Sequence, residues 1–313
     1  MVAQVSTGTG RTGSAMTAKR AGLARLIWRN RAGYVFIAPG YLAFLAFMLL
    51  PLLAAVGLSF YNASFALDQR QFTGFQNYVQ LWADSTFRIA LVNTIKYVVV
   101  VVPVTVVLAL VISLLVHPRG TRAQAFYRGA FYLPGVAGGV ILSVVWQWIF
   151  NPTFGLLNYI LGIVGIQPVL WLASTQYSFW SVCMVVLTFT LGQPVILFLA
   201  ALASLNQDVM DAAVVDGANS TQRTWFVTLP LMRPIILFVV ATQTIGVFQI
   251  WETIYMLTQG GPSQSSTSLV FLIYQTAFIA GKYGKASAIG VVLLILVTIV
   301  TLLQLRFWNR AEY

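Results

Sequence analysis

Long apolar stretches alternate with shorter polar ones along most of the chain. Six of these stretches reach the length of about 20 residues that a helix needs to cross the hydrocarbon core of a membrane. They cover approximately residues 34–60, 90–116, 131–150, 179–205, 231–257 and 288–307. The pattern therefore predicts an all-α membrane protein, with six transmembrane helices in a domain that spans residues 33–313.

Residues 1–32 form a different kind of segment, rich in Ser, Thr and Gly. Its basic residues, which no acidic residue accompanies, are Arg11, Lys19, Arg20, Arg25, Arg29 and Arg31. Between residues 18 and 31 these bases alternate with Leu23, Leu26 and Ile27, which predicts a short amphipathic helix on the membrane surface. The apolar stretch that follows exceeds the roughly 7–15 residues of a signal-peptide core, so we expect a retained cytoplasmic tail.

Composition agrees with the membrane prediction, because 59% of the 313 residues are hydrophobic and 8% are charged. A formal net charge of +11 would suit a nucleic-acid partner, but no basic stripe interleaved with aromatic residues accompanies it. In a chain this apolar, the excess of Lys and Arg instead indicates membrane orientation and contact with anionic lipid. A single Cys183 and a single His117 offer no metal-ligand cluster.

The basic residues divide unevenly between the two ends of the predicted helices. With the N-terminus in the cytoplasm, 13 of the 18 basic residues lie on the cytoplasmic side. The outer side keeps Arg70, Arg88, Lys96, Lys282 and Lys285. By the positive-inside rule, we expect both chain termini and the polar segment between the fourth and fifth helices to face the cytoplasm.

Two outer segments have recognisable local patterns. The sequence GLLNYILGIVGIQPVLWL, residues 155–172, is too apolar for a free loop and too interrupted for a span, so it predicts a helix at the outer membrane interface. Directly after the fifth stretch, Gly260, Gly261 and Pro262 predict a tight turn.

The motifs of the common catalytic sites are missing. The sequence has no Gly-rich phosphate loop of the G-x-x-x-x-G-K-[ST] type, no G-x-S-x-G elbow and no H-E-x-x-H helix. We therefore predict that the chain is not an enzyme and does not hydrolyse ATP alone.

The polar segment between the fourth and fifth stretches, DAAVVDGANSTQRTWFVTLPLMRP, predicts a helix–turn–helix. Gly217 interrupts the first helix, since Gly costs about 1 kcal/mol in a helix interior relative to Ala. Asn219 is expected to cap the second helix, with Gln222 reaching back in a capping box, and Pro230 is expected to end it. Small and acidic residues in a turn of this kind suit a docking surface.

This segment resembles the signature of the permease subunits of binding-protein-dependent ABC importers: E-A-A, then D-G-A, then a Phe-Trp-x-x-T-L-P tail. Its first part corresponds to Asp211, Ala212 and Ala213, with Asp in place of Glu, and its second to Asp216, Gly217 and Ala218. Trp225 and the Thr228–Leu229–Pro230 run match the tail, whereas Thr224 stands where the family has Phe.

Other motifs are similar to the sugar branch of that family, which includes the maltose, multiple-sugar and glycerol-phosphate permeases. They are the Trp148–Asn151 run with the Gly155–Asn158 run that follows it, and the Leu257–Pro262 turn. The resemblance implies a multi-pass protein of a bacterial or archaeal inner membrane. It also implies two ATP-binding subunits that hold ATP and Mg, a second homologous permease and an extracellular substrate-binding protein. No cofactor is expected in this chain.

The resemblance also implies site residues. Those expected to couple to the ATPases are Asp211, Ala212, Ala213, Asp216, Gly217, Ala218, Trp225 and Pro230. Residues Gly260, Gly261 and Pro262 are expected to lie where the binding protein docks, although a plain tight turn explains the glycines equally well.

Substrate contacts are expected on the fifth and fourth stretches. Glu252 is the only carboxylate within any of the six stretches, and an ionisable residue inside a membrane is a functional candidate by default. On a continuous helix it would share a face with Gln249, beside Trp251 and Tyr255, and these groups suit the hydroxyls and C–H face of a sugar. The alternative is an interfacial carboxylate paired with Lys282 or Lys285.

On the fourth stretch, Thr188, Gly192 and Gln193 lie near mid-depth, followed by Pro194, which frees a backbone carbonyl. Gln243 lies at a similar depth on the fifth stretch. Each could line a substrate path or pack against a neighbouring helix.

These observations predict the membrane subunit of an ATP-driven importer for a sugar. An importer of the same architecture for a non-sugar solute, such as a glycerophosphate, is the first alternative. A stand-alone channel or secondary transporter is the second, and it would need no docking segment.

Overall fold

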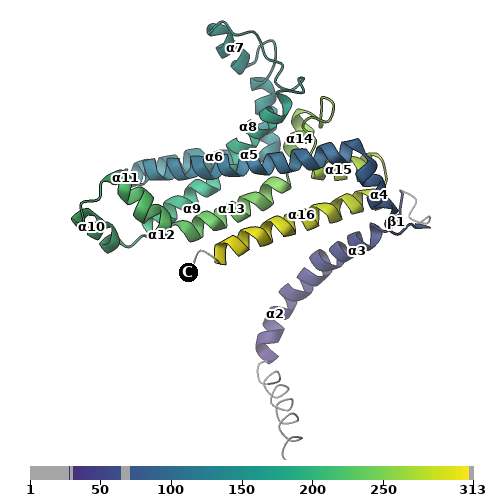
Figure 1. Cartoon of the computed structure of the whole chain (residues 1–313), viewed down its shortest axis with the longest axis horizontal. Coiled ribbons are helices and arrows are strands. Elements are labelled where there is room, and N and C mark those ends of the chain that lie inside the picture. The colour runs from purple at the N-terminus through teal and green to yellow at the C-terminus, as the bar shows by residue number, and fades with distance from the viewer. Residues whose placement is uncertain (1–27, 29–30, 65–70, 310–313) are drawn as a thin grey trace, which may run out of the picture. The chain divides into compact units, whose positions relative to one another are not determined.

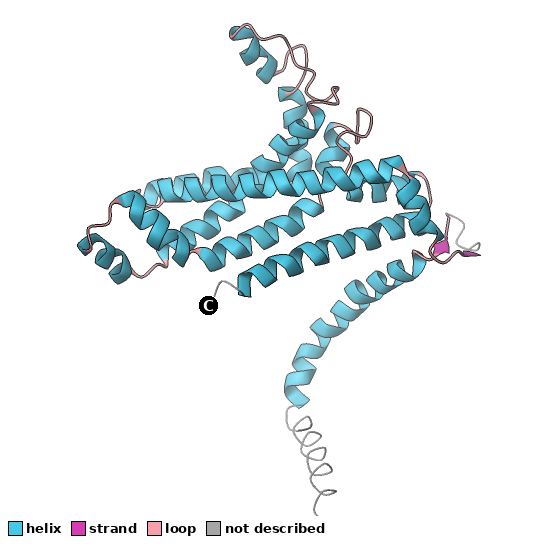
Figure 2. Ribbon diagram, viewed as in Figure 1, coloured by secondary structure: helices cyan, strands magenta, loops and turns pink. Residues whose placement is uncertain are grey.

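The computed structural model describes residues 28, 31–64 and 71–309, and of residues 307–309 only the backbone. The amphipathic helix predicted over residues 18–31 lies almost entirely outside this range. Helices make up most of the described chain, and the strands in it are limited to one short pair (Figure 2). The all-α prediction is therefore confirmed.

The chain divides into two compact units, residues 1–55 and 56–313. In the first unit, α2 (Arg31–Phe44) and the π-helical turn η1 (Leu45–Leu49) lead into α3 (Leu50–Leu58), which runs on into the second unit. In the most apolar part of the stretch Arg31–Leu58, no residue is buried by the rest of the chain. A helix that is apolar on all sides needs lipid or another protein around it.

A proline that follows the turn explains two of the π-helical turns. Pro51 follows η1, and Pro230 follows η2 (Thr224–Thr228). Proline has no backbone N–H and clashes with the carbonyl four residues back, which belongs to Phe47 in one case and Phe226 in the other. Each carbonyl lies inside its π-helical turn, so the wider turn relieves the clash.

The second unit contains the remaining elements. They are β1 (Tyr61–Asn62), β2 (Gln71–Phe72), α4 (Gln76–Ala83), α5 (Ser85–Val116), α6 (Thr121–Ile149), α7 (Leu156–Ile163), α8 (Ser178–Thr190), α9 (Gly192–Ala203), α10 (Gln207–Val215), α11 (Ser220–Arg223), η2, α12 (Leu229–Leu231), α13 (Arg233–Phe248), α14 (Glu252–Leu257), α15 (Leu269–Tyr274), η3 (Gln275–Ile279) and α16 (Tyr283–Asn309). The two strands pair antiparallel, with Tyr61 opposite Phe72.

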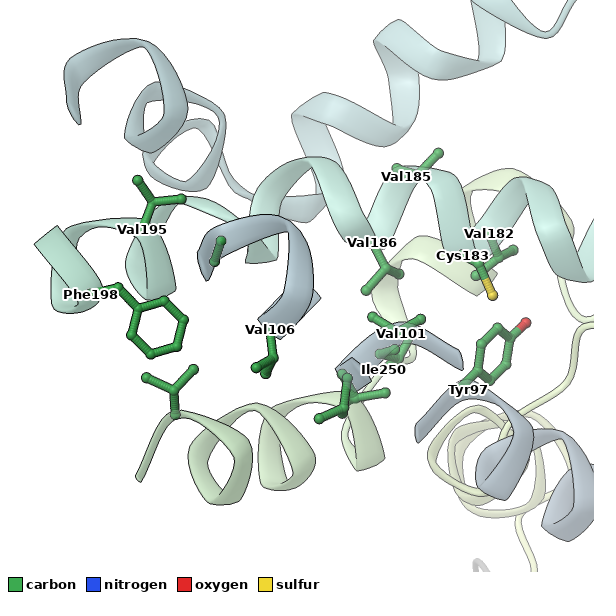
Figure 3. Close-up of a cluster of buried hydrophobic side chains, with 14 of the residues drawn as sticks. Tyr97, Val101, Val106, Val182, Cys183, Val185, Val186, Val195, Phe198 and Ile250 are labelled. Atoms are coloured by element: carbon green, nitrogen blue, oxygen red, sulfur yellow. The ribbon is translucent and has the colours of Figure 1, made fainter. Parts of the chain in front are cut away.

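Helix α5 lies at the centre of this unit. It packs against α8, α9, α13 and α15, while α6 packs against α8, α9 and α14, and α16 lies against α13 and α15 (Figure 1). The core between α5, α8 and α9 is built from β-branched and aromatic side chains, including Val101, Val106, Val186 and Phe198 (Figure 3). Tyr97 is fully buried there and stacks on Phe179 with ring centroids 4.5 Å apart.

Among the residues that the structure describes, four helices are long and apolar enough to cross a membrane, and up to six if each bent helix pair counts as one span. The α8–α9 pair bends by 43°, and the pair formed by Ser220–Leu231 and α13 bends by 66°.

The expectation that Pro230 ends its helix is off by one residue, because the helix continues to Leu231 and breaks at Met232. Pro234 favours a break here, since it cannot donate to the carbonyl of Pro230.

The predicted fifth stretch, 231–257, is not one continuous helix. α13 ends at Phe248, and α14 begins at Glu252. The intervening Trp251 has φ −145° and ψ −39°, which is not helical. The apolar pattern gave no sign of this break because the segments on both sides, residues 231–248 and 253–257, remain mostly hydrophobic.

In the 155–172 segment, α7 forms as predicted, and one side chain organises its surroundings. Asn158 Nδ2 donates to the carbonyls of Pro152 and Val169, while its Oδ1 accepts from the Val169 amide and the Trp171 indole. A buried amide that uses both of its ends fixes the loop around it.

Candidate functional site

The segment from Gln207 to Leu231, here called the DGA segment, forms two short helices joined by a glycine turn. Asp216 is the C-cap of α10, and Gly217 follows with φ 83°. The amides of Gly217 and Ala218 donate to the carbonyls of Val214 and Ala213, both at 3.0 Å. This is a Schellman motif, which requires a left-handed residue at the position of Gly217.

The second helix of the DGA segment begins with the predicted capping box. The Gln222 amide donates to Asn219 Oδ1, and the Asn219 amide donates to Gln222 Oε1, both at 2.9 Å. The prediction of a helix–turn–helix with this cap is confirmed.

The DGA segment presents a surface of mixed character. The acidic residues Asp211 and Asp216 are exposed, as are Ala212, Gly217 and Pro230, while Ala213 and Ala218 are half-buried. Large apolar side chains are exposed beside them: Val215 86%, Phe226 78% and Trp225 64%. Exposed apolar groups that gather around a turn indicate a contact with another protein or with the membrane.

Thr224, which stands where the family signature has Phe, is half-buried. Its hydroxyl donates to the Ser220 carbonyl at 3.0 Å. The residue lines a pocket of about 400 Å³ between the DGA segment, the C-terminal ends of α5 and α9, and the turn after α5. No large side chain of the described residues fills this space.

A second glycine turn, residues 258–268, is here called the GGP loop. Gly260 is buried with φ 83°, and a Cβ there would lie 2.4 Å from Thr267 Oγ1 and 2.8 Å from Phe271 Cε1. The Gly261–Pro262 peptide bond is cis. Gly260 is thus required by packing, and Gly261 and Pro262 are more accessible because they are half-buried.

The GGP loop is fastened to the neighbouring helices by hydrogen bonds. Asn93 of α5 donates from Nδ2 to the carbonyls of Gln264, Ser265 and Thr267, at 3.1–3.3 Å. The hydroxyl of Tyr97 donates to the Ser266 carbonyl at 2.9 Å. These contacts join residues about 170 positions apart in the sequence.

Helix α13 ends at Phe248, close to the last residue of the GGP loop, Ser268. The hydroxyl of Ser268 donates to the Ile250 carbonyl at 2.7 Å, which satisfies a backbone group that the break would leave unpaired. Glu252 is exposed in the first turn of α14, and Gln249 caps α13 on the other side of the break. The expectation that these two residues share one helix face was wrong, because the helix between them is interrupted.

Trp251 lies in a cluster of rings beside Glu252. Its ring centroid is 5.3 Å from that of Tyr274, which lies 5.5 Å from Tyr255 and 5.8 Å from Phe278. Tyr255 is 39% and Phe278 67% exposed, so the cluster offers free ring faces. The sequence reasoning used Trp251 and Tyr255 but missed Tyr274 and Phe278, whose only signal was their spacing of four residues.

One alternative partner for Glu252 is already engaged. Lys285 Nζ lies 2.8 Å from Asp84 Oδ2, at the N-terminus of α5. Burial opposes ionisation of Asp84, but the hydrogen bond and charge of Lys285 and the amides of Thr86 and Phe87 outweigh it and hold its pKa below the usual value. Lys285 therefore belongs to this pair and not to Glu252.

The candidates on the fourth stretch differ from one another. A Cβ on Gly192 would lie 2.4 Å from the Phe131 carbonyl oxygen, so this glycine permits close packing of α9 on α6. The Thr188 hydroxyl donates to the Val185 carbonyl of its own helix at 2.6 Å. Gln193 is exposed, and Gln243 on α13 is buried. Gln193 is therefore the accessible member of the set.

Comparisons with known proteins bear on these features. A family described as "Binding-protein-dependent transport system inner membrane component" matches residues 85–312. The chain belongs to this family. It is therefore a permease, the membrane component of a binding-protein-dependent transport system. The resemblance based on the DGA segment is confirmed.

Individual relatives match over nearly the full length. The lactose transport system permease protein LacF of Rhizobium radiobacter is 31% identical over 92% of this chain and 97% of its own. The probable ABC transporter permease protein YesP of Bacillus subtilis is 32% identical over 90% of this chain and 93% of its own.

A solved structure supports the fold. A chain of a bacterial ABC transporter involved in the import of the acidic polysaccharide alginate superposes with a TM-score of 0.79 at 22% identity, covering 92% of this chain and 98% of that one. The same kind of chain, in a complex with an alginate pentasaccharide-bound periplasmic protein, also has a TM-score of 0.79.

Proposed function

We propose that this permease is one membrane-spanning subunit of an ATP-driven importer that translocates a sugar delivered by an extracellular binding protein. The observation that carries the proposal is the near full-length similarity to LacF, a lactose transport system permease. The partly exposed ring cluster beside Glu252 supports it, because sugars stack their C–H faces on aromatic rings and direct hydroxyls to carboxylates.

The proposed partners are two ATP-binding subunits, a second homologous permease and the binding protein. ATP and Mg would be held by the ATP-binding subunits. Both termini and the DGA segment would face the cytoplasm, and the GGP loop would face the binding protein, in agreement with the distribution of basic residues.

In this proposal the DGA segment transmits force. Closure of the two ATP-binding subunits would move α10–α12 as a rigid body, and the bent helix pair that begins at Ser220 would carry that movement into α13. Binding of a loaded receptor outside and of ATP inside would together favour an outward-open cavity, and hydrolysis would reset it.

Among the proposed substrate contacts, Glu252, Trp251 and Gln193 fit best because they are accessible. Gln249, Thr188 and Gln243 are kept as further candidates. Gly192 would act by letting α9 approach α6.

The test is uptake by the reconstituted transporter, with the sugar that the co-purified binding protein retains. Gly217→Asp is expected to abolish ATP-coupled uptake and leave membrane insertion intact. Gly165→Asp is the matched control, because Gly165 also has a positive φ with open space around it but lies near α7. Wild-type uptake by the Gly217→Asp variant, or uptake by the isolated chain without ATP-binding subunits, would reject the proposal.

A further inference from the structure

The pocket behind the DGA segment combines an apolar floor with an unused donor. Leu114 of α5 and Leu202 of α9 line it together with Met210 of α10, while Arg223 and Thr224 form the side toward α11 and η2. Its volume of about 400 Å³ lies within the range of roughly 300–1,000 Å³ that is typical of ligand pockets.

Arg223 lines this pocket, and its side chain has a donor without a partner in the described part of the chain. Its Nε is buried, and no group in the described part of the chain accepts a hydrogen bond from it. Leaving a buried donor of a charged group unpaired is costly, so such a group indicates a missing acceptor.

The acids nearby do not supply that acceptor. Asp211 Oδ1 accepts from Gln207 Nε2 at 3.0 Å, and Asp208 lies in the first turn of α10, where a carboxylate complements the helix dipole. Neither carboxylate lies within ion-pair distance of Arg223. Within the described residues, the guanidinium of Arg223 therefore has no carboxylate partner.

We propose that this pocket receives a carboxylate side chain of the ATP-binding subunit, with its aliphatic part against Leu114, Leu202 and Met210 and its carboxylate on Arg223. The inference rests on the proposed function, because it presupposes that partner. In the family signature a Phe occupies position 224, so Thr224 leaves room here for a partner side chain to enter.

In this arrangement, each of the two proteins presents side chains to the other. The exposed Trp225 and Phe226 project from the chain toward the partner, and the pocket accepts a group from it. An ion pair that becomes desolvated in the complex raises specificity and slows dissociation. Arg223 is thus proposed as a positioning residue for coupling.

The experiment measures the affinity of the purified ATP-binding subunit for the membrane subunits in nanodiscs. Arg223→Gln is expected to weaken binding by about 30-fold or more, because it removes one partner of a desolvated charge pair. Arg223→Lys is expected to keep binding within about fivefold, since the charge remains. Arg122→Gln is the control, because Arg122 is an exposed base of the α6 N-terminus outside the pocket and should bind as wild type.

Thr224→Phe tests the pocket itself. Filling the space is expected to weaken binding by tenfold or more, whereas Thr224→Val, which leaves the space open, should change it less than threefold. Equal melting temperatures of the variants without the partner would show that folding is intact.

Each further outcome is decisive. Wild-type affinity of Arg223→Gln overturns the inference, and so does an equal loss in Arg122→Gln, which would indicate a general charge effect. Weakening by Thr224→Phe alone would mean that an apolar side chain enters the pocket, which also overturns it. If the wild-type chain does not bind any ATP-binding subunit, the proposed function itself fails.

Discussion

The DGA segment and the GGP loop are both built around a glycine with φ 83°, yet the two glycines meet opposite surroundings. A Cβ on Gly217 would meet nothing within 4 Å, whereas a Cβ on Gly260 would clash with Thr267 and Phe271. One turn keeps its surface free for a partner, and the other uses its surface to pack within the chain. The same backbone conformation thus serves an external contact in one region and an internal one in the other.

The surrounding contacts repeat this difference. The GGP loop receives hydrogen bonds from Asn93 and Tyr97 of α5, and Asp84 at the same end of α5 pairs with Lys285. In the DGA segment, Asp211 and Asp216 are exposed and pair with no base in the described part of the chain. Stability therefore depends on the first region and is expected to depend little on the second.

The largest effect is expected for Gly260→Ala. The added methyl group meets both an unfavourable φ and a steric clash, which together should lower the free energy of unfolding by about 2–5 kcal/mol. Gly261→Ala is the control, because its Cβ would make an ordinary contact of 3.4 Å with the Thr258 carbonyl oxygen. Thermal unfolding in detergent measures both, and equal melting temperatures would contradict the packing role of Gly260.

Asn93→Ala is expected to come next. It would leave three carbonyls of the GGP loop without their donor, at a cost of about 1–3 kcal/mol. Hydrogen exchange should rise in residues 264–268, and the DGA segment should remain unchanged. Faster exchange in both regions would show that the two regions are not independent.

Gly217→Ala should have a smaller effect on stability than Gly260→Ala. Only the positive φ opposes the methyl group, so we expect a loss of about 1 kcal/mol, similar to that of Gly165→Ala. The same unfolding measurement applies. A loss as large as that of Gly260→Ala would show that the DGA segment is packed within the chain after all.

The smallest effect is expected for Asp84→Asn. Asparagine retains the N-cap, so only the half-exposed ion pair with Lys285 is lost, at about 0–1 kcal/mol. Because the pKa of Asp84 is lowered in the folded state, this contribution is present above the carboxyl's usual pKa of 3.8 and is lost as the pH falls below it. The difference in melting temperature between wild type and Asp84→Asn should therefore disappear in acid. As a control at neutral pH, Asp216→Asn should leave the melting temperature unchanged, because Asp216 is exposed and forms no ion pair in the described part of the chain.

Local patterns in the sequence were enough for the helical class and for the turns that depend on neighbouring residues. Apolar length predicted the helical class, and Asn219 with Gln222 predicted a capping box that forms as expected. These features depend on interactions within a few residues, which spacing in the sequence makes visible. The motif around Asp216 and Gly217 was enough to indicate the family for the same reason.

Tertiary structure decided the features that depend on residues far apart in the chain. The break before Glu252 is stabilised by Ser268, the ring cluster joins Trp251 to Tyr274, and Lys285 pairs with Asp84. An apolar run gives no sign of such a break. Hydrophobicity indicates that a segment is buried in membrane or protein, but it does not show where the helical backbone hydrogen bonds stop and other hydrogen bonds replace them. The pocket at Thr224 is likewise invisible in the sequence, since a cavity is defined by the ends of helices that meet only in the folded chain.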